Sequence, residues 1–220
     1  MYGPAFSQGN TIESFVPKNW NIITTAKGDL NNDGAEDAAI VIEDTNRKNF
    51  LPNNEGMGHD TLNVNPRRLI VLFKDAKGYN LKASNDTFIP SENDSTDYCL
   101  NDPFVKSVDG FFIKKGVLHI SFIQEAVCGR YNTKDRQYKF RMQQNDFVLI
   151  GYDEQLYDKQ KGDTEEVSIN FLSRKESRTT GGNYFQEELN HPKTLLKTFK
   201  LPNLIPLSAL KKEWENQFDF

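Results

Sequence analysis

Residues 28–42 read Gly28-Asp29-Leu30-Asn31-Asn32-Asp33-Gly34-Ala35-Glu36-Asp37-Ala38-Ala39-Ile40-Val41-Ile42. The last five are apolar and largely branched, a pattern typical of a buried strand. Residues 19–25, which precede the stretch, also have an extended pattern. The stretch therefore predicts two β-strands joined by a polar, acidic loop.

This loop has oxygen-bearing residues at alternate positions. Calcium takes about six to eight oxygen ligands, and a short loop supplies them from positions 1, 3, 5 and 9 and from the backbone carbonyl at position 7. Gly34 stands at position 6, where the chain must reverse and a positive φ is needed. The spacing predicts a Ca²⁺ site whose ligands are Asp29, Asn31, Asp33, the carbonyl of Ala35, and Asp37.

Two alternatives to this calcium loop can be weighed from the sequence. An EF-hand needs a bidentate Glu at position 12 and a following helix, but this chain has Ile40 there, within a strand pattern. The second alternative is an acidic hairpin turn that binds no ion. Without the bidentate Glu, calcium binding should be weak to moderate, which suits the millimolar calcium found outside the cytoplasm.

The loop resembles the calcium loops of FG-GAP and integrin-α propellers, which also lie between two strands. The resemblance rests on residues 28–37 and covers about one repeat, with no second copy in the chain. It implies a calcium-binding, propeller-like or related β fold.

Other segments resemble uncharacterised exported proteins or lipoproteins of Gram-negative bacteria. They are residues 15–18 (Phe-Val-Pro-Lys), the Gly-Asp-Leu-Asn loop, residues 147–153 and residues 168–173. This resemblance spans most of the chain and implies a periplasmic or secreted location, with a lipid anchor allowed in the precursor. It implies no particular activity.

Composition excludes some function classes. The 220 residues carry a net charge of −4, which gives no electrostatic reason to bind nucleic acid or an anionic membrane. No apolar run approaches the roughly 20 residues of a membrane helix. Hydrophobic content is only 37%, but 16 Phe and 8 Tyr can bury large areas.

Cysteine usage and the N-terminus bear on the compartment. Cys99 and Cys128 both lie beside turn-forming residues, and a disulfide between them would contribute roughly 3–4 kcal/mol by closing a loop. The alternative is two separate buried thiols. Residues 5–7 (Ala-Phe-Ser) have small residues where a signal peptidase cuts, so we expect the tail of a removed export signal.

Alternating apolar runs bounded by Gly, Asn, Asp and Pro predict a mainly β fold of antiparallel meander sheets, either propeller-like or a sandwich. We expect residues 1–14 to be a flexible tail and residues 15–220 to form a single calcium-binding β domain. Leu207, Leu210 and Trp214 have helical spacing and predict one short C-terminal helix. The expected strands are Trp20–Thr25, Ala38–Glu43, Arg68–Lys74, Tyr79–Lys82, Gly110–Lys114, Val117–Glu125, Arg136–Gln143, Phe147–Tyr152, Glu166–Ser173 and Thr194–Phe199.

Three polar segments interrupt this pattern, and each predicts a long exposed loop. They are residues 46–65, residues 87–103 and residues 173–190.

Catalytic motifs are scarce. The chain has three histidines, His59, His119 and His191, and none has a cysteine or carboxylate at metal-ligand spacing. No nucleophile elbow, HExxH helix, phosphate loop or dinucleotide fingerprint is present. Glu125 and Asp135 flank the turn at Cys128 and are the one carboxylate pair that suggests glycoside hydrolysis. We therefore predict no catalytic residues and favour a non-catalytic role.

The sequence favours an exported, calcium-binding β protein that binds another protein or an envelope component. Three alternatives stay open. They are a periplasmic immunity protein that neutralises a secreted bacterial toxin, a glycan-directed hydrolase, and a unit of a larger adhesive array.

Overall fold

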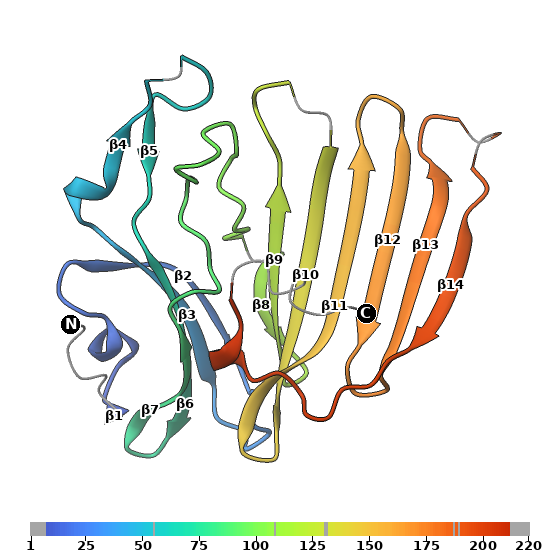
Figure 1. Cartoon of the computed structure of the whole chain (residues 1–220). Coiled ribbons are helices and arrows are strands. Elements are labelled where there is room, and N and C mark those ends of the chain that lie inside the picture. The colour runs from blue at the N-terminus through green and yellow to red at the C-terminus, as the bar shows by residue number, and fades with distance from the viewer. Residues whose placement is uncertain are drawn as a thin grey trace.

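The computed structural model describes residues 8–54, 56–107, 109–129, 132–186, 188 and 190–211. Within these residues the chain is mainly β, and every strand pairing within its sheets is antiparallel (Figure 1). The strands form a five-stranded sheet, a seven-stranded sheet and a small two-stranded sheet. The sheets do not close into a barrel over the described residues, so a mainly β, sandwich-like fold is confirmed.

The five-stranded sheet is buried on both faces. Along β3, residues 38–42 are fully buried, as their continuous apolar run predicts. Ala39 and Val41 face the core shared with the second sheet, whereas Ile40 and Ile42 face a second cluster that includes Phe15. In sheet order the strands are β1 (Gln8–Gly9), β7 (Gly78–Asn85), β6 (Arg67–Asp75), β3 (Asp37–Asp44) and β2 (Trp20–Gly28).

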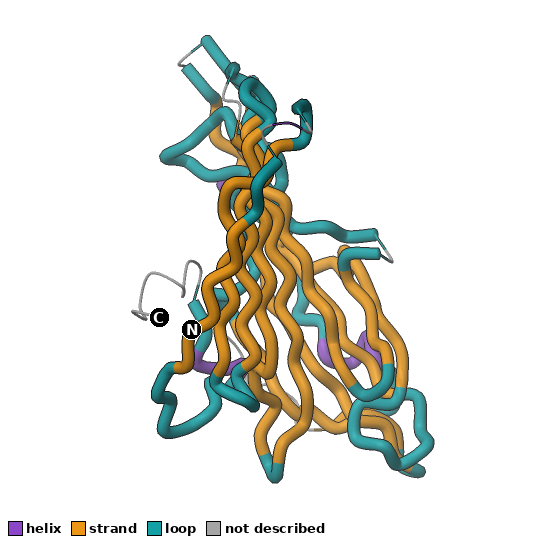
Figure 2. Tube along the Cα trace, turned by 90° about the vertical axis from the view of Figure 1, so that its right-hand side faces the viewer, coloured by secondary structure: helices purple, strands orange, loops and turns teal. Residues whose placement is uncertain are grey.

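The seven-stranded sheet is a meander, because each strand pairs with its neighbours in sequence. Most of its strands alternate between an apolar inner face and a polar outer face, as in a sheet with one side in water, but the last two, over residues 175–183 and 193–198, do not. Loops and turns gather at the two ends of the strands (Figure 2). The strands are β8 (Phe111–Lys114), β9 (Val117–Gln124), β10 (Asn132–Gln143), β11 (Asp146–Asp158), β12 (Asp163–Asn170), β13 (Lys175–Asn183) and β14 (Lys193–Thr198).

Aromatic side chains fill the core between the two large sheets. The ring of Phe88 packs edge-on against Phe122, Tyr138 and Phe140, with ring centroids 5.4, 5.0 and 5.7 Å away. Such edge-to-face pairs add to the stabilisation from burial. At the end of β2, a side chain on Gly28 would lie 2.7 Å from a methyl carbon of Ile113, so this glycine allows β2 to approach β8.

A buried ion-pair network fastens the loop between β7 and β8 to the five-stranded sheet. The side chain of Arg67 is fully buried and donates to Glu43 at 2.6 Å and to both carboxylate oxygens of Asp102 at 2.7 and 2.9 Å. Burial alone would raise the pKa of Asp102, but hydrogen bonds and charge from Arg67, with a smaller effect of Lys106, lower it. The loop over residues 87–103, predicted to be exposed, is therefore partly built into the core through Phe88.

Two other predicted loops contain strands. Residues 173–190 include β13, although their polar sequence has no apolar alternation, because β12 and β14 supply backbone partners on both sides. Residues 46–65 include the hairpin of β4 (Phe50–Pro52) and β5 (Thr61–Asn63), preceded by the 3₁₀ turn η2 (Arg47–Asn49). The prediction of irregular loops was wrong for these parts.

The termini also differ from expectation. Among the described residues, the segment of the predicted C-terminal helix forms only the 3₁₀ turn η4 (Leu207–Ala209), and Leu210 is already extended with φ −71° and ψ 141°. The side-chain amide of Asn85 donates to the carbonyls of Leu207 and Leu210, which holds this segment in a non-helical form. Trp214 lies outside the described residues. Within the expected N-terminal tail, β1 pairs with β7 and is followed by the 3₁₀ turn η1 (Ile12–Phe15).

Candidate functional site

The predicted calcium loop connects β2 to β3, as the sequence indicated. The carboxylate of Asp29 organises it by accepting from three backbone amides: Asn32 at 2.6 Å, Asp33 at 3.2 Å and Gly34 at 2.9 Å. Gly34 has a φ of 86°, which L-residues rarely adopt, and Asn32 has a φ of 63°. The loop therefore folds back around the first expected ligand.

The next expected ligands follow the same turn. The side-chain oxygen of Asn31 accepts from the amide of Asp33 at 3.0 Å, and Oδ1 of Asp33 accepts from the amide of Ala35 at 2.7 Å. The amide nitrogen of Asn31 donates to the other oxygen of Asp33 at 2.8 Å. The hydrogen bonds from Ala35 and Asn31 lower the pKa of Asp33, so its side chain is held as a carboxylate.

The last acidic ligand, Asp37, differs from the others because it is fully buried. One oxygen accepts from the amide of Leu30 at 2.9 Å, and the other accepts from the amide of Lys74 on β6 at 2.8 Å. Burial raises the pKa of Asp37, and the charges of Asp33 and Asp29 raise it further against these two hydrogen bonds. Asp29 and Asp33 are therefore close enough to Asp37 for their charges to repel its carboxylate.

The loop fits a hard divalent cation in donor type and charge. All five expected ligands present oxygen, and a cation would offset the repulsion among Asp29, Asp33 and Asp37. Over the described ranges, no group of three or more His, Cys, Asp or Glu side chains is placed to hold a metal ion. The expected set contains three aspartates, so in this structure their carboxylates do not gather around one point, and they accept hydrogen bonds from backbone amides instead. The set would also use the side chain of Asn31 and the carbonyl of Ala35.

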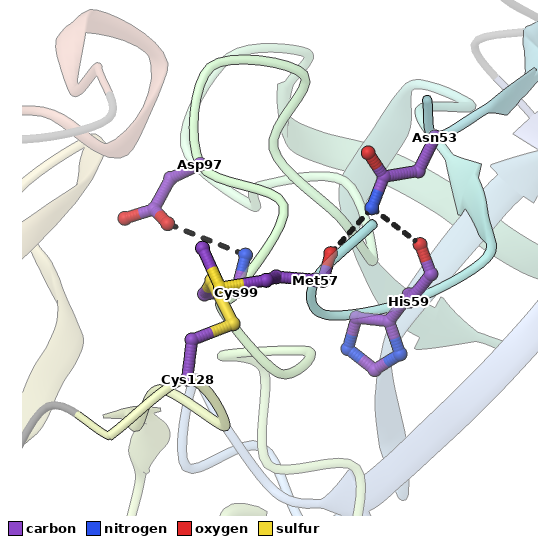
Figure 3. Close-up of a disulfide and its surroundings, with 6 residues drawn as sticks. All are labelled: Asn53, Met57, His59, Asp97, Cys99 and Cys128. Carbon is purple, nitrogen blue, oxygen red and sulfur yellow. Dashed lines mark hydrogen bonds between the residues drawn. A yellow bond between two sulfur atoms is a disulfide. The ribbon is translucent and has the colours of Figure 1, made fainter. Parts of the chain in front are cut away.

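A disulfide joins Cys99 and Cys128 at the loop end of the molecule, with their Cα atoms 5.4 Å apart (Figure 3). It connects the loop before β8 to the turn after β9. The turn of the β4–β5 hairpin packs beside the disulfide, because the amide of His59 donates to the carbonyl of Tyr98. The approach is so close that a Cβ on Gly58 would clash with the carbonyl oxygen of Tyr98. The disulfide and the hydrogen bond from His59 together connect three of the loops at this end.

The histidines do not form a catalytic group within the described residues. The ring of His119 stacks on Phe112 at 4.3 Å and lies 3.3 Å from the side-chain oxygen of Gln137. Its pKa is lowered, chiefly by burial. Nε2 of His59 is buried without a hydrogen-bond partner in the described part of the chain, and His191 is exposed.

Two hollows lie away from the calcium loop. A cavity of about 440 Å³ between the sheets has an apolar floor of Phe88, Phe122 and Tyr138. A second hollow of about 580 Å³ lies on the polar face of the seven-stranded sheet and is lined in part by Asp135. Burial raises the pKa of Asp135, and the nearby charge of Glu125 raises it further, although Glu125 forms an ion pair with Lys159.

The sequence did not indicate which distant groups complete these sites. The amide of Lys74 that supports Asp37 lies 37 residues away in the chain. Arg67 joins acids 24 and 35 residues away. The pair Arg67-Arg68 at the start of an apolar strand run is the one sequence signal at this position.

Comparison with known proteins gives no family for this chain. No protein-family model matches it, and neither a curated protein nor a solved structure shows significant similarity. The fold and the loop together define a mainly β, antiparallel protein with an oxygen-rich turn between two strands. Within the described residues, no helix is long and apolar enough to span a membrane.

Proposed function

We propose that this chain is an exported, calcium-binding β protein that acts by binding another protein. The observation that carries the proposal is the loop of residues 29–37, in which the charges of Asp29 and Asp33 act on Asp37 across a glycine turn. Asp37 is buried, and an ion would compensate its charge. The disulfide between Cys99 and Cys128 supports export, since such bonds persist in oxidising compartments.

In this proposal calcium organises the structure and takes no part in chemistry. Asp37 accepts amides from the loop and from β6, so an ion held beside it would couple the loop to the centre of the five-stranded sheet. The ligands would be Asp29, Asn31, Asp33, the carbonyl of Ala35, and Asp37.

Protein binding is supported by apolar side chains left in solvent. Tyr184 and Phe185, whose ring centroids lie 6.0 Å apart in the connection after β13, expose 77% and 54% of their surface. Leu196 on β14 exposes 75%. Clustered exposed apolar residues mark interaction sites on soluble proteins. The sequence suggested that this acidic chain binds another protein, and a periplasmic immunity protein is one version of that proposal.

A calorimetric titration tests the calcium part. Calcium added to the chelator-treated protein should release or absorb heat and raise the melting temperature. The Asp29→Ala and Asp33→Ala double variant should lose both effects. Asp158→Ala is the matched control, because Asp158 also accepts amides within an exposed turn, from Gln160 and Lys161. No heat and no change in melting temperature for the unaltered protein would refute the calcium site.

A second candidate, a glycan-directed hydrolase, is favoured by one observation. The raised pKa of Asp135 beside Glu125, in a polar hollow, suits a proton donor in glycoside hydrolysis. Release of reducing ends from a panel of polysaccharides, abolished by Asp135→Asn, would support it. Equal rates for the protein and this variant would exclude it.

A further inference from the structure

One long edge of β14 (Lys193–Thr198) is open. In sheet order β14 pairs with β13 alone, and Figure 1 places it at the outer margin of the seven-stranded sheet. All six of its residues are exposed, and Leu195 and Leu196 expose 56% and 75% of their surface. An exposed apolar edge is a template on which another strand can pair.

The backbone groups that face this edge can be identified. The amide of Phe199 donates to the carbonyl of Arg174, so residue 199 points its backbone groups toward β13. In an antiparallel ladder this direction alternates along the strand. The amides and carbonyls of Thr194, Leu196 and Thr198 therefore point to the open edge, where they offer donors and acceptors at the spacing of a further strand.

The edge is basic although the chain is acidic. Residues 173–200 contain six Lys and Arg residues and three Glu, while the whole chain has a net charge of −4. Lys193 and Lys197 lie on β14 itself. On the neighbouring strand Glu176 is 2% exposed and pairs with Arg178, so its charge is directed inward. A strand arriving at this edge meets Lys193 and Lys197, which lie on the same face of β14 because they are four residues apart in one strand.

We propose that β14 binds an acidic, extended segment of a partner protein, which is added to the seven-stranded sheet as a further antiparallel strand. Backbone pairing at Thr194, Leu196 and Thr198 supplies affinity, and the lysines select acidic side chains. A second copy of this chain would bring its own Lys193 and Lys197 to the same edge, where like charges repel. The inference deepens the protein-binding part of the proposed function and does not depend on calcium.

The test uses a capped eight-residue peptide that alternates Glu and Val, titrated into the ¹⁵N-labelled full chain. Binding should shift the amide signals of Thr194, Leu196 and Thr198 and slow their hydrogen exchange at least tenfold. A peptide that alternates Glu and Pro has the same charge, but it lacks every second backbone donor, and each Pro fixes φ near about −65°, away from the antiparallel β value. It should bind at least tenfold more weakly. A peptide that alternates Lys and Val should also bind at least tenfold more weakly than the Glu-Val peptide.

Variants separate backbone pairing from charge. Leu196→Pro removes an amide that points to the open edge but leaves the ladder to β13 intact, so it should weaken binding of the Glu-Val peptide at least tenfold. Leu196→Thr keeps this amide, so its affinity for the peptide should stay within threefold of the parent's. Lys193→Glu with Lys197→Glu should also weaken binding tenfold. The control variant, Lys77→Glu with Lys115→Glu, makes the same change in charge on two other turns and should not weaken binding.

The inference is overturned if the Glu-Val peptide produces no shifts at millimolar concentration, or if the Glu-Pro or Lys-Val peptide binds equally well. It is also overturned if sedimentation shows a dimer that Leu196→Pro abolishes, because the occupant is then a second copy. Calcium binding measured on the same samples keeps the outcomes separate. If the protein binds calcium but not the Glu-Val peptide, only the inference about the β14 edge is refuted. The Asp29→Ala and Asp33→Ala double variant should still bind the peptide.

Discussion

Replacing Asp102 by Asn should destabilise the protein far more than the same change at Asp86. Asp102 accepts two hydrogen bonds from Arg67, whose side chain is fully buried, and Asn would place an amide donor against a guanidinium donor. Breaking a buried pair typically costs about 3–5 kcal/mol. Glu43 still pairs with Arg67, and the Asp102 side chain is 20% exposed, so we expect about 2–4 kcal/mol.

Asp86 is the matched control because it binds the adjacent arginine. Its carboxylate accepts from Arg68 at 2.5 and 3.1 Å, but the Asp86 side chain is 49% exposed. Exposed pairs contribute about 0–1 kcal/mol, which is what Asp86→Asn should cost.

Urea unfolding followed by fluorescence measures both free energies, and calorimetry should show a fall in melting temperature of about 4–16 °C for Asp102→Asn. Because the folded-state pKa of Asp102 is lowered, its contribution is present above the unfolded pKa and is lost as the pH falls through the folded pKa. The difference between the protein and Asp102→Asn should therefore shrink below about pH 4. Equal costs at the two positions, or a cost below about 1 kcal/mol for Asp102→Asn, would refute this account of the network.

Three further predictions follow from burial, covalent structure and charge. Phe140→Ala removes a fully buried ring and should lower the unfolding free energy by about 3–5 kcal/mol, measured by urea titration; a loss under about 1 kcal/mol would mean the core is not packed around this ring. Replacing Cys99 and Cys128 by Ser should cost about 3–4 kcal/mol, since the bond spans 29 residues, and the reduced parent should match the variant. Calcium at ten times its dissociation constant should raise the free energy of unfolding by about 1.4 kcal/mol at neutral pH. This gain should vanish on acidification, and the loss should begin above the ordinary aspartate pKa range, because the pKa of Asp37 is raised. A gain that persists in acid would contradict the role of Asp37.

Local patterns predicted the parts of the fold that depend on local chemistry. The turn at Lys115 and Gly116 has φ values of 52° and 73°, and it joins β8 to β9 as the sequence indicated. β13 was missed because its polar residues are held by backbone pairing on both sides, which leaves no side-chain pattern. The helix predicted at residue 207 failed because Asn85, over 120 residues earlier, takes the carbonyls that a helix would use.

The candidate site likewise has a part that local sequence indicates and a part that depends on contacts between distant strands. The alternate spacing from Asp29 to Asp37 is enough to propose the loop ligands, because these residues are close together in sequence, and their binding of an ion stays a prediction. The amide of Lys74 that supports Asp37, and the pairing of Arg67 with Asp102, depend on how separate strands meet.

The two amide hydrogen bonds from Asn85 also bear on how the chain assembles during synthesis. Strands β8 to β14 each pair with a sequence neighbour, so hairpins can form as soon as both strands have left the ribosome. The carbonyls of Leu207 and Leu210 are 122 and 125 residues from Asn85, and this contact closes the longest loop described for the chain. We therefore expect the segment around η4 to dock last, where it contacts β7 through Asn85 and β11 through Val148.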